Sequence, residues 1–367
     1  PAGPAGSAGP AGTAGTVGPA GTAGLAGTAG LAALAERVDL VPAAGDALDG
    51  TLLLGEIHRP HVIRLAASPA PCTAPARNRL DRLATEAARP DLDDLDARPI
   101  AGIVELLVAA EGAAHGAVLA AVPRITAAAE AIAARLAHGG RLFYAGAGTP
   151  GRLGVLDAAE CGPTFGTELV RGVIAGGPAA LTQAVDGAED TFNPADLAGL
   201  TAADALVGIT ASGRTPYVLG ALEHARAAGA LSVAIVNNAR SEAAADIVVE
   251  LLTGPEVLAG STRLTAGTSQ KVVLNALSTS VMIALGKAYG PRMVDVRATN
   301  AKLRRRSVRM VSEAARVDED TAATALTAAD GHVKTAIVAL LAGVDAVAAR
   351  ARLEAVHGHV REALATS

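Results

Sequence analysis

Residues 141–152, RLFYAGAGTPGR, begin with a short apolar run and continue into a glycine-rich loop. Residues 205–216, ALVGITASGRTP, have the same order: an apolar run followed by a loop of glycine and hydroxyl side chains. A segment with helical spacing follows each loop, so free backbone N–H groups and hydroxyls gather at a helix N-terminus, where an anion is favoured. Two such units predict parallel strands that hold a phosphorylated small molecule at the carboxyl edge of their sheet.

Further apolar runs and helical patterns alternate around these loops. The predicted strands are 141–145, 169–175, 205–210, 231–236 and 246–251, and the predicted helices are 100–111, 116–138, 151–159, 178–186, 216–228 and 267–288. Short strands that alternate with helices are typical of α/β proteins, so we expect a doubly wound parallel sheet. Beyond residue 300 the spacing is helical and predicts helices at 318–329, 333–341 and 344–364.

Composition divides the chain into three regions. Residues 1–30 have glycine at every third position, and the following residues add only short apolar patches between Pro and Asp. Such a composition cannot bury a core, so we expect a disordered, low-complexity extension over residues 1–78. Residues 79–305 are expected to form the α/β domain with its N-terminal helices, and residues 306–367 a small C-terminal helical domain.

The overall composition restricts the partners and the compartment. The 367-residue chain is half apolar but has three Phe, three Tyr and no Trp, so its core must consist of Ala, Val, Leu and Ile. Its net charge of −5 does not favour nucleic acid or an anionic membrane as a partner. No apolar stretch reaches the roughly 18 residues of a membrane span. The two cysteines, Cys72 and Cys161, do not suggest a disulfide framework, which fits a reducing cytoplasm.

The first loop offers Gly148, Thr149, Gly151 and Arg152 as phosphate ligands. Its spacing also matches G-x-G-x-x-G, but dinucleotide-binding folds place an acidic residue near the end of the second strand. Here that strand ends in AGG at 175–177, so the sequence disfavours a dinucleotide. A turn that merely needs glycine between a strand and a helix is an alternative interpretation.

The second loop offers Ser212, Gly213, Arg214 and Thr215 as ligands, and the proline after it fits the first helical position, where no N–H is needed. A phosphate would accept hydrogen bonds from these hydroxyls and from the backbone. The alternative is that Thr215 only caps the helix.

A third polar cluster, STRLTAGTSQK at 261–271, opens the long helix predicted at 267–288. Its hydroxyls, such as that of Ser261, either contact the ligand or cap the helix. Lys271 is a candidate partner for an anion.

Two glutamates are candidates for proton transfer. Glu160 ends the helix predicted after the first loop, and Glu189 follows the next helical segment. Paired carboxylates whose environments separate their pKa values are a common solution for acid–base catalysis. The spacing alone leaves open that each is a solvated residue at the end of a helix.

Long stretches of the chain resemble the N-acetylmuramic acid 6-phosphate etherase family, which has the sugar isomerase (SIS) fold. The similar stretches are GAGTPGRLGVLDAAEC (146–161), PTFGT (163–167), AVDGAED (184–190), ASGRTPYVLG (211–220), GPEVLAGSTRLTAGTSQKVVLNALST (254–279) and MVDVRATNAKL (293–303). They occur in the family's order, and the resemblance extends over roughly residues 80–365. It does not cover residues 1–75.

The resemblance implies an enzyme that cleaves the ether between the sugar C3 and D-lactate by elimination and hydration. It implies that Glu160 is the acid–base residue and Glu189 the second carboxylate. It also implies an amino-sugar phosphate as substrate, no metal or organic cofactor, and a homodimer in which each site is completed near the subunit interface.

The chain departs from the family pattern in three places. Pro150 replaces a serine whose hydroxyl and N–H would help to hold the phosphate, so we expect weaker binding rather than its abolition. Cys161-Gly162-Pro163 replaces Cys-Pro-Pro, and residues 88–107 lack the family's regular acidic, Ser/Thr-containing segment, which places the substrate lid and dimer contacts in doubt. A non-catalytic sugar-phosphate-binding regulator of the same fold, similar to glucokinase regulatory protein, is the main alternative. An aldose–ketose isomerase shares only the phosphate loops.

Overall fold

The computed structural model describes residues 41–42, 51–52, 61–64, 83–296 and 301–365, which fall into two compact units, 1–75 and 76–367. In the first unit, strands β1 (Val41–Pro42), β2 (Thr51–Leu52) and β3 (His61–Arg64) pair antiparallel in the order β1-β3-β2. The rest of the extension, for which the sequence predicts disorder, lies outside the described residues.

The second unit contains a five-stranded parallel sheet, which confirms the predicted doubly wound α/β fold. Its strands are β4 (Leu142–Gly146), β5 (Val170–Ile174), β6 (Ala205–Thr210), β7 (Leu231–Val236) and β8 (Ile247–Glu250), in the order β5-β4-β6-β7-β8. The chain passes from β4 to β5 in one direction and then returns to β6 on the other side of β4. This reversal is the switch point at which open α/β sheets bind ligands.

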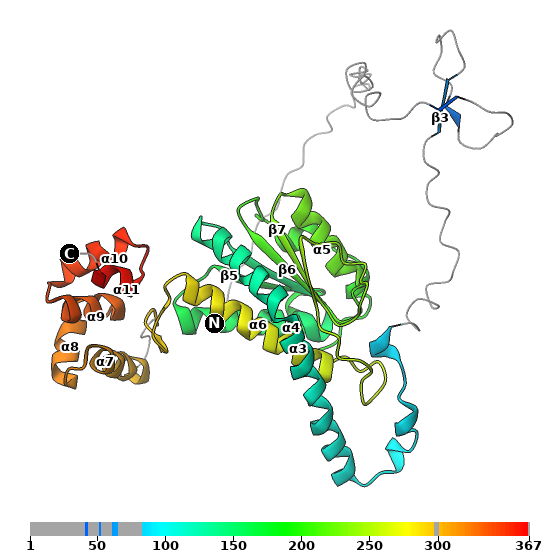
Figure 1. Cartoon of the computed structure of the whole chain (residues 1–367), viewed down its shortest axis with the longest axis horizontal. Coiled ribbons are helices and arrows are strands. Elements are labelled where there is room, and N and C mark those ends of the chain that lie inside the picture. The colour runs from blue at the N-terminus through cyan, green and yellow to red at the C-terminus, as the bar shows by residue number, and fades with distance from the viewer. Residues whose placement is uncertain (1–40, 43–50, 53–60, 65–82, 297–300, 366–367) are drawn as a thin grey trace, which may run out of the picture. The chain divides into compact units, whose positions relative to one another are not determined.

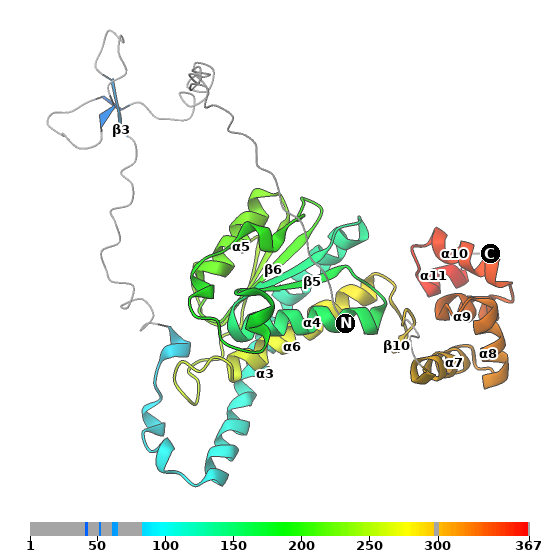
Figure 2. The ribbon, with the colours of Figure 1, turned by 180° about the vertical axis from the view of Figure 1, so that it is seen from behind.

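Helices cover both faces of this sheet (Figures 1 and 2). Helices α3 (Ile100–Ala137), α4 (Gly148–Phe165) and α6 (Thr265–Ala284) bury one face, and α5 (Pro216–Ala227) buries the other. Alternate residues of β4 point to opposite faces, so Leu142 and Tyr144 belong to one core and Phe143 and Ala145 to the other. Both cores consist mainly of Ala, Val, Leu and Ile, as the composition required.

Short 3-10 helices lie in the connections. They are η1 (Ala84–Glu86), η2 (Pro90–Leu92), η3 (Leu95–Ala97), η4 (Gly177–Leu181), η5 (Ala188–Asp190) and η6 (Pro194–Leu197). The helix predicted at 178–186 is wrong, because only η4 forms there. Residues 181–187 are all exposed, and a short helix without a packed face is not stable in water.

Two other helices are longer than the sequence suggested. Helix α4 begins at Gly148 and continues to Phe165, so Glu160 lies within the helix instead of ending it. Helix α3 is continuous through Pro123 instead of being two helices. By length and composition alone, α3 could cross a membrane. In its apolar 18-residue window, 17% of the residues are buried. The sequence-based expectation considered uninterrupted apolar stretches, whereas every 18-residue window of α3 includes a charged side chain such as Glu111 or Arg124.

Five helices follow the antiparallel strands β9 (Ala288–Tyr289) and β10 (Arg292–Met293). They are α7 (Ala301–Ala315), α8 (Glu319–Ala328), α9 (Val333–Ala342), α10 (Ala346–Ala355) and α11 (Val360–Ala365), which share a core. The helix predicted at 344–364 is thus two helices, because His357 and Gly358 have positive φ angles and interrupt it. Helix α7 crosses the boundary expected between residues 305 and 306.

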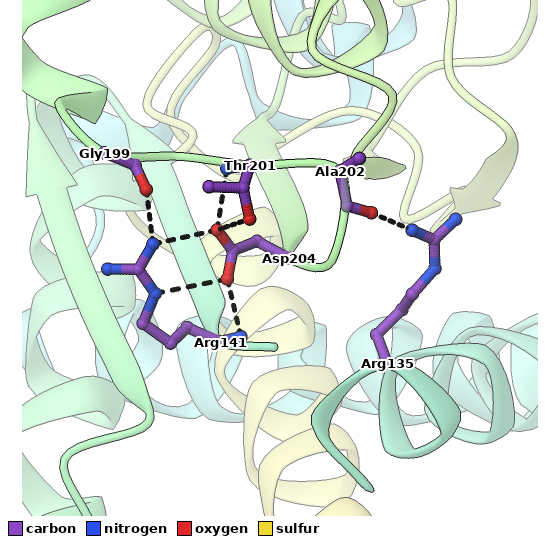
Figure 3. Close-up of polar contacts among 6 residues, drawn as sticks. All are labelled: Arg135, Arg141, Gly199, Thr201, Ala202 and Asp204. Carbon is purple, nitrogen blue, oxygen red and sulfur yellow. Dashed lines mark hydrogen bonds and ion pairs between the residues drawn. The ribbon is translucent and has the colours of Figure 1, made fainter. Parts of the chain in front are cut away.

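The amino edge of the sheet is held by charged contacts (Figure 3). Arg141 precedes β4 and donates to Asp204, which precedes β6, and to the carbonyl oxygen of Gly199. Arg135, at the end of α3, donates to the carbonyl oxygen of Ala202 in the same connection. The glycine-rich loops lie at the opposite, carboxyl edge.

Candidate active site

The first loop brings the end of β4 against the first turn of α4. A Cβ atom on Gly151 would lie 2.6 Å from both the carbonyl oxygen of Gly146 and Cγ1 of Ile174, so only glycine permits this approach. Gly148 has a φ of 57°, which also favours glycine. The turn between β4 and α4 therefore needs glycine at these positions, as the alternative interpretation of the first loop supposed. No side chain caps α4, and its first N–H groups point to the carboxyl edge, where an anion is favoured.

Hydroxyl groups organise the second loop. The Oγ1 atoms of Thr210 and Thr215 are 2.8 Å apart, and the N–H of Gly213 donates to Thr210 at 3.2 Å. The N–H of Arg214 donates to Ser212 Oγ at 3.1 Å. Helix α5 begins at Pro216, and Thr215 makes no side-chain capping bond to it, so the alternative in which Thr215 only caps the helix is wrong.

A buried carboxylate caps α6, the helix that begins within the third cluster. The sequence interpretation missed this residue. Glu256 is 1% exposed, and its two oxygens accept from the N–H groups of Thr265 and Ala266 at 3.0 and 2.9 Å. No hydroxyl caps α6, so Ser261 does not have this role. A Cβ on Gly267, in the first turn of α6, would be 3.4 Å from Cγ2 of Thr149. The start of α6 therefore lies against the first loop.

A short segment before α3 also reaches this edge. Residues 83–86, the N-terminal strap, include η1 and are held by Thr85, which is fully buried. The Nδ2 of Asn238 donates to Thr85 Oγ1 at 2.9 Å and to the carbonyl oxygen of Ala211, at the start of the second loop, at 3.0 Å. The N–H of Gly260, next to Ser261, donates to the carbonyl oxygen of Thr85 at 3.1 Å. The strap thus links the second loop to the third cluster.

Lys271 lies beside α4. Its Nζ is 3.6 Å from Oδ1 of Asp157 and donates to Asn275 at 2.7 Å. Asp157 is buried and also accepts from Tyr144 at 2.9 Å and from Ser278 at 3.3 Å. Burial raises the pKa of Asp157 despite these hydrogen bonds. Lys271 therefore balances a carboxylate inside the α4–α6 contact and has a partner other than a phosphate.

The thiol next to Glu160 is not poised for nucleophilic chemistry. Cys161 is buried and free, and burial raises the pKa of its thiol to about 12. Cys72 lies outside the described residues. No group of three or more His, Cys, Asp or Glu side chains in the described part of the chain is arranged to hold a metal ion.

Arg152 supports the segment that leads to Glu189. Its guanidinium donates to the carbonyl oxygens of Leu181 and Gln183 at 3.2 and 3.0 Å. Glu189 is exposed on η5, and the preceding Ala188 packs against Gly176, just beyond the carboxyl end of β5. Arg152 therefore fixes a loop at the same edge as the two glycine-rich loops.

Glu160 lies apart from this edge within one chain. It is exposed on α4, and at about 1.5 Å per residue it is roughly 18 Å along the helix axis from Gly148. The predicted ligands that the structure gathers at the carboxyl edge are Gly148, Thr149, Gly151, Ser212, Gly213, Arg214, Thr215 and Ser261. Arg214 also lies 3.5 Å from Glu242 in an ion pair.

Comparisons with known proteins identify the family of this chain. Residues 124–226 match the family model described as the glucokinase regulatory protein N-terminal SIS domain. The chain is 54% identical to the N-acetylmuramic acid 6-phosphate etherase of Streptomyces avermitilis, over 78% of this chain and 95% of that protein. This chain belongs to the N-acetylmuramic acid 6-phosphate etherase family. The etherase of Burkholderia lata is 49% identical over 78% of this chain and 97% of its own length.

Among solved structures, a phosphoheptose isomerase from Francisella tularensis has a TM-score of 0.35 and 17% identity, over 50% of this chain and 98% of that chain. This likeness carries no argument about activity. The alignments with the two etherases, in contrast, span 95% and 97% of those proteins' lengths.

Proposed function

We propose that this protein is a carbon–oxygen lyase that cleaves the lactyl ether of N-acetylmuramic acid 6-phosphate, giving N-acetylglucosamine 6-phosphate and D-lactate. The observation that carries the proposal is the 54% identity over 95% of an etherase, together with the presence of Glu160 and Glu189 in the DAAEC and GAED motifs. A diverged regulator of the same fold would have no need to keep both carboxylates.

The loops suit the phosphate end of this substrate. The uncapped N-terminus of α4 offers backbone N–H groups, and the second loop adds the hydroxyls of Ser212 and Thr215. The N-terminus of α6 is already occupied by Glu256, whose negative charge disfavours a phosphate there. We therefore assign the phosphate to the first and second loops, with the sugar extending toward Ser261 and the segment that carries Glu189.

The chemistry requires two proton transfers. In the open-chain sugar, the C1 aldehyde acidifies the C2 proton, which a carboxylate removes. The electron pair forms a C2–C3 double bond as the C3–O bond breaks, and lactate leaves with a proton. Water then adds, returning a hydroxyl to C3 and a proton to C2. We assign these transfers to Glu160 and Glu189, each worth roughly 10²–10⁴-fold in rate.

A homodimer would bring Glu160 to a phosphate site. Within one chain, most of the length of α4 lies between Glu160 and the glycine-rich loops. The Glu160 that acts at a given phosphate site would therefore come from a second subunit. Helix α3 exposes an apolar stripe at Ile100, Val104 and Val108, which are 80%, 51% and 69% exposed. Leu156, one turn before Glu160, is also exposed at 45%. We propose that a second copy of the chain covers these side chains.

We also propose that the enzyme acts in the cytoplasm.

The decisive experiment measures D-lactate released from N-acetylmuramic acid 6-phosphate by the purified chain, with Glu160→Ala as the control. We expect release by the natural chain and none by the folded variant. Binding of the phosphosugar without release would instead support the regulator, and a ketose product would support an isomerase.

Mixing two inactive variants tests the shared site. If Glu160 acts on the partner's substrate and Glu189 on that of its own chain, a mixed dimer of Glu160→Ala and Glu189→Ala has one intact site. Random pairing in a symmetric dimer would then restore about a quarter of the activity. No restoration after unfolding and refolding the mixture would show that each chain supplies both carboxylates to one site.

A further inference from the structure

The N-terminal strap carries a carboxylate that no step above uses. Thr85 is fixed on both sides, through Asn238 to the second loop and through Gly260 to the third cluster. The next residue, Glu86, is exposed. Because its neighbour is fully buried and makes these long-range hydrogen bonds, the backbone that carries Glu86 is held in place.

The carboxylate of Glu86 lies against the turn that precedes Ser261. Gly260 has a φ of 75°, and a Cβ on Gly260 would be 2.8 Å from Oε2 of Glu86. An alanine at this position would therefore be strained and would displace the carboxylate. The glycine keeps the turn and the carboxylate in close contact at the rim of the site.

The described residues give Glu86 no partner for this charge. Its carboxylate has no hydrogen bond or ion pair with any other side chain in residues 83–296 and 301–365, although its own backbone N–H donates to Leu83. An ionised carboxylate offers only acceptors, and its hydrogen bonds to neutral donors are stronger than those between neutral groups. It would repel a phosphate but attract hydroxyl or amide N–H donors.

We propose that Glu86 is a specificity-determining residue whose carboxylate accepts hydrogen bonds from the hydroxyl or acetamido N–H groups of the sugar, with Thr85 as its positioning residue. The proposal rests on the phosphosugar site proposed above. The phosphate lies at the first and second loops, so the neutral, donor-rich part of the same molecule extends past Ser261 to the strap. Backbone N–H groups of the loops thus bind the phosphate of the substrate, and the Glu86 carboxylate binds the donors of its sugar.

The test compares Glu86→Gln with Glu223→Gln, a control at an exposed glutamate on α5. Glutamine keeps one acceptor oxygen but loses the charge, and a hydrogen bond to a charged group is roughly twice as strong as a neutral one, so Glu86→Gln should raise the KM for lactate release about three- to tenfold. We expect kcat to stay within about threefold, since Glu86 has no proton-transfer role. Inorganic phosphate should inhibit both variants as it inhibits the natural chain. An unchanged KM for Glu86→Gln would overturn the proposal.

The positioning role has its own variants. Thr85→Val removes the oxygen that accepts from Asn238 and should raise KM in the same direction, whereas Thr85→Ser keeps the oxygen and should restore it. A loss of thermal stability with an unchanged KM in the folded Thr85→Val enzyme would show that the strap is only structural.

A binding measurement separates this proposal from the proposed reaction. Calorimetric titration with N-acetylglucosamine 6-phosphate requires no turnover, so it decides the role of Glu86 even if the natural chain releases no lactate. Weaker binding by Glu86→Gln, with unchanged binding of inorganic phosphate, supports the assignment. Equal affinities for the sugar phosphate refute it.

Discussion

Arg141 and Asp204 join the starts of two neighbouring strands through three hydrogen bonds (Figure 3). The backbone N–H of Arg141 donates to Oδ1 of Asp204 at 2.7 Å, and its guanidinium donates to Oδ1 and Oδ2 at 3.1 and 2.9 Å. Thr201 adds two more donors to Oδ2, from its N–H at 2.8 Å and its hydroxyl at 3.0 Å. The contact fixes β4 beside β6 at the amino edge, and thereby aligns the two glycine-rich loops at the other edge.

We expect Asp204→Ala to reduce the free energy of unfolding by about 2–4 kcal/mol, because it leaves several donors without an acceptor. Urea unfolding followed by circular dichroism measures this loss. Asp94→Ala is the matched control, since Asp94 is 66% exposed in its ion pair with Arg98 and an exposed ion pair contributes little to stability. Equal losses in the two variants would contradict the role given to Asp204.

The same residue makes stability depend on pH. Burial alone would raise the pKa of Asp204, but hydrogen bonds from Arg141 and Thr201 outweigh it and hold the pKa below the usual value of an aspartate. A lowered pKa in the folded state means that this stabilisation is complete above the unfolded value and is lost as the pH falls through the folded value. The difference in unfolding free energy between the natural chain and Asp204→Asn should therefore be constant from about pH 5 to 8 and shrink below about pH 4. A difference that grows on acidification would give the opposite sign and exclude this explanation.

Replacing glycine by alanine should have opposite effects on stability at two positions. Gly151→Ala would force a Cβ to within 2.6 Å of Gly146 and Ile174, so we expect a loss of about 1–3 kcal/mol and a displaced first loop. Gly102→Ala, in α3, meets nothing within 4 Å and should stabilise the protein by some tenths of a kcal/mol. Thermal unfolding and binding of N-acetylglucosamine 6-phosphate distinguish the two. A Gly151→Ala enzyme that binds normally would show that the close approach does not shape the site.

The sequence was most informative where local pattern and structure coincide. Each predicted strand lies within one residue of an observed one, because apolar runs bounded by glycine and polar residues identify buried parallel strands. The ends of α4 and the break between α10 and α11 were missed, since they depend on positive φ angles at single residues such as Gly166 and His357. Helix boundaries of this kind leave little trace in periodicity.

The parts of the site that the sequence missed are all long-range polar contacts. Asn238 meets Thr85 across 153 positions, and Glu256 caps a helix that begins nine residues later. Neither residue belongs to a periodic pattern or a short motif with a physical mechanism. The two loops rich in glycine and hydroxyl side chains, in contrast, can be recognised in the sequence, because a phosphate site needs several donors close together in the chain.

A variant at Pro150 tests the proposal that the first loop holds the phosphate. It is the third residue of α4, where the N–H has no partner within the helix, so proline is tolerated there but removes a donor. Pro150→Ser would add an N–H and a hydroxyl at the helix N-terminus, and we expect a KM for the phosphosugar about tenfold lower with kcat nearly unchanged. The melting temperature should fall slightly, because serine gives the unfolded chain about 0.4–1 kcal/mol of additional entropy. Pro194→Ser, at the start of η6, is the control and should share only the thermal effect. If KM stays the same in Pro150→Ser, the phosphate is held by the second loop and the flanking N–H groups alone.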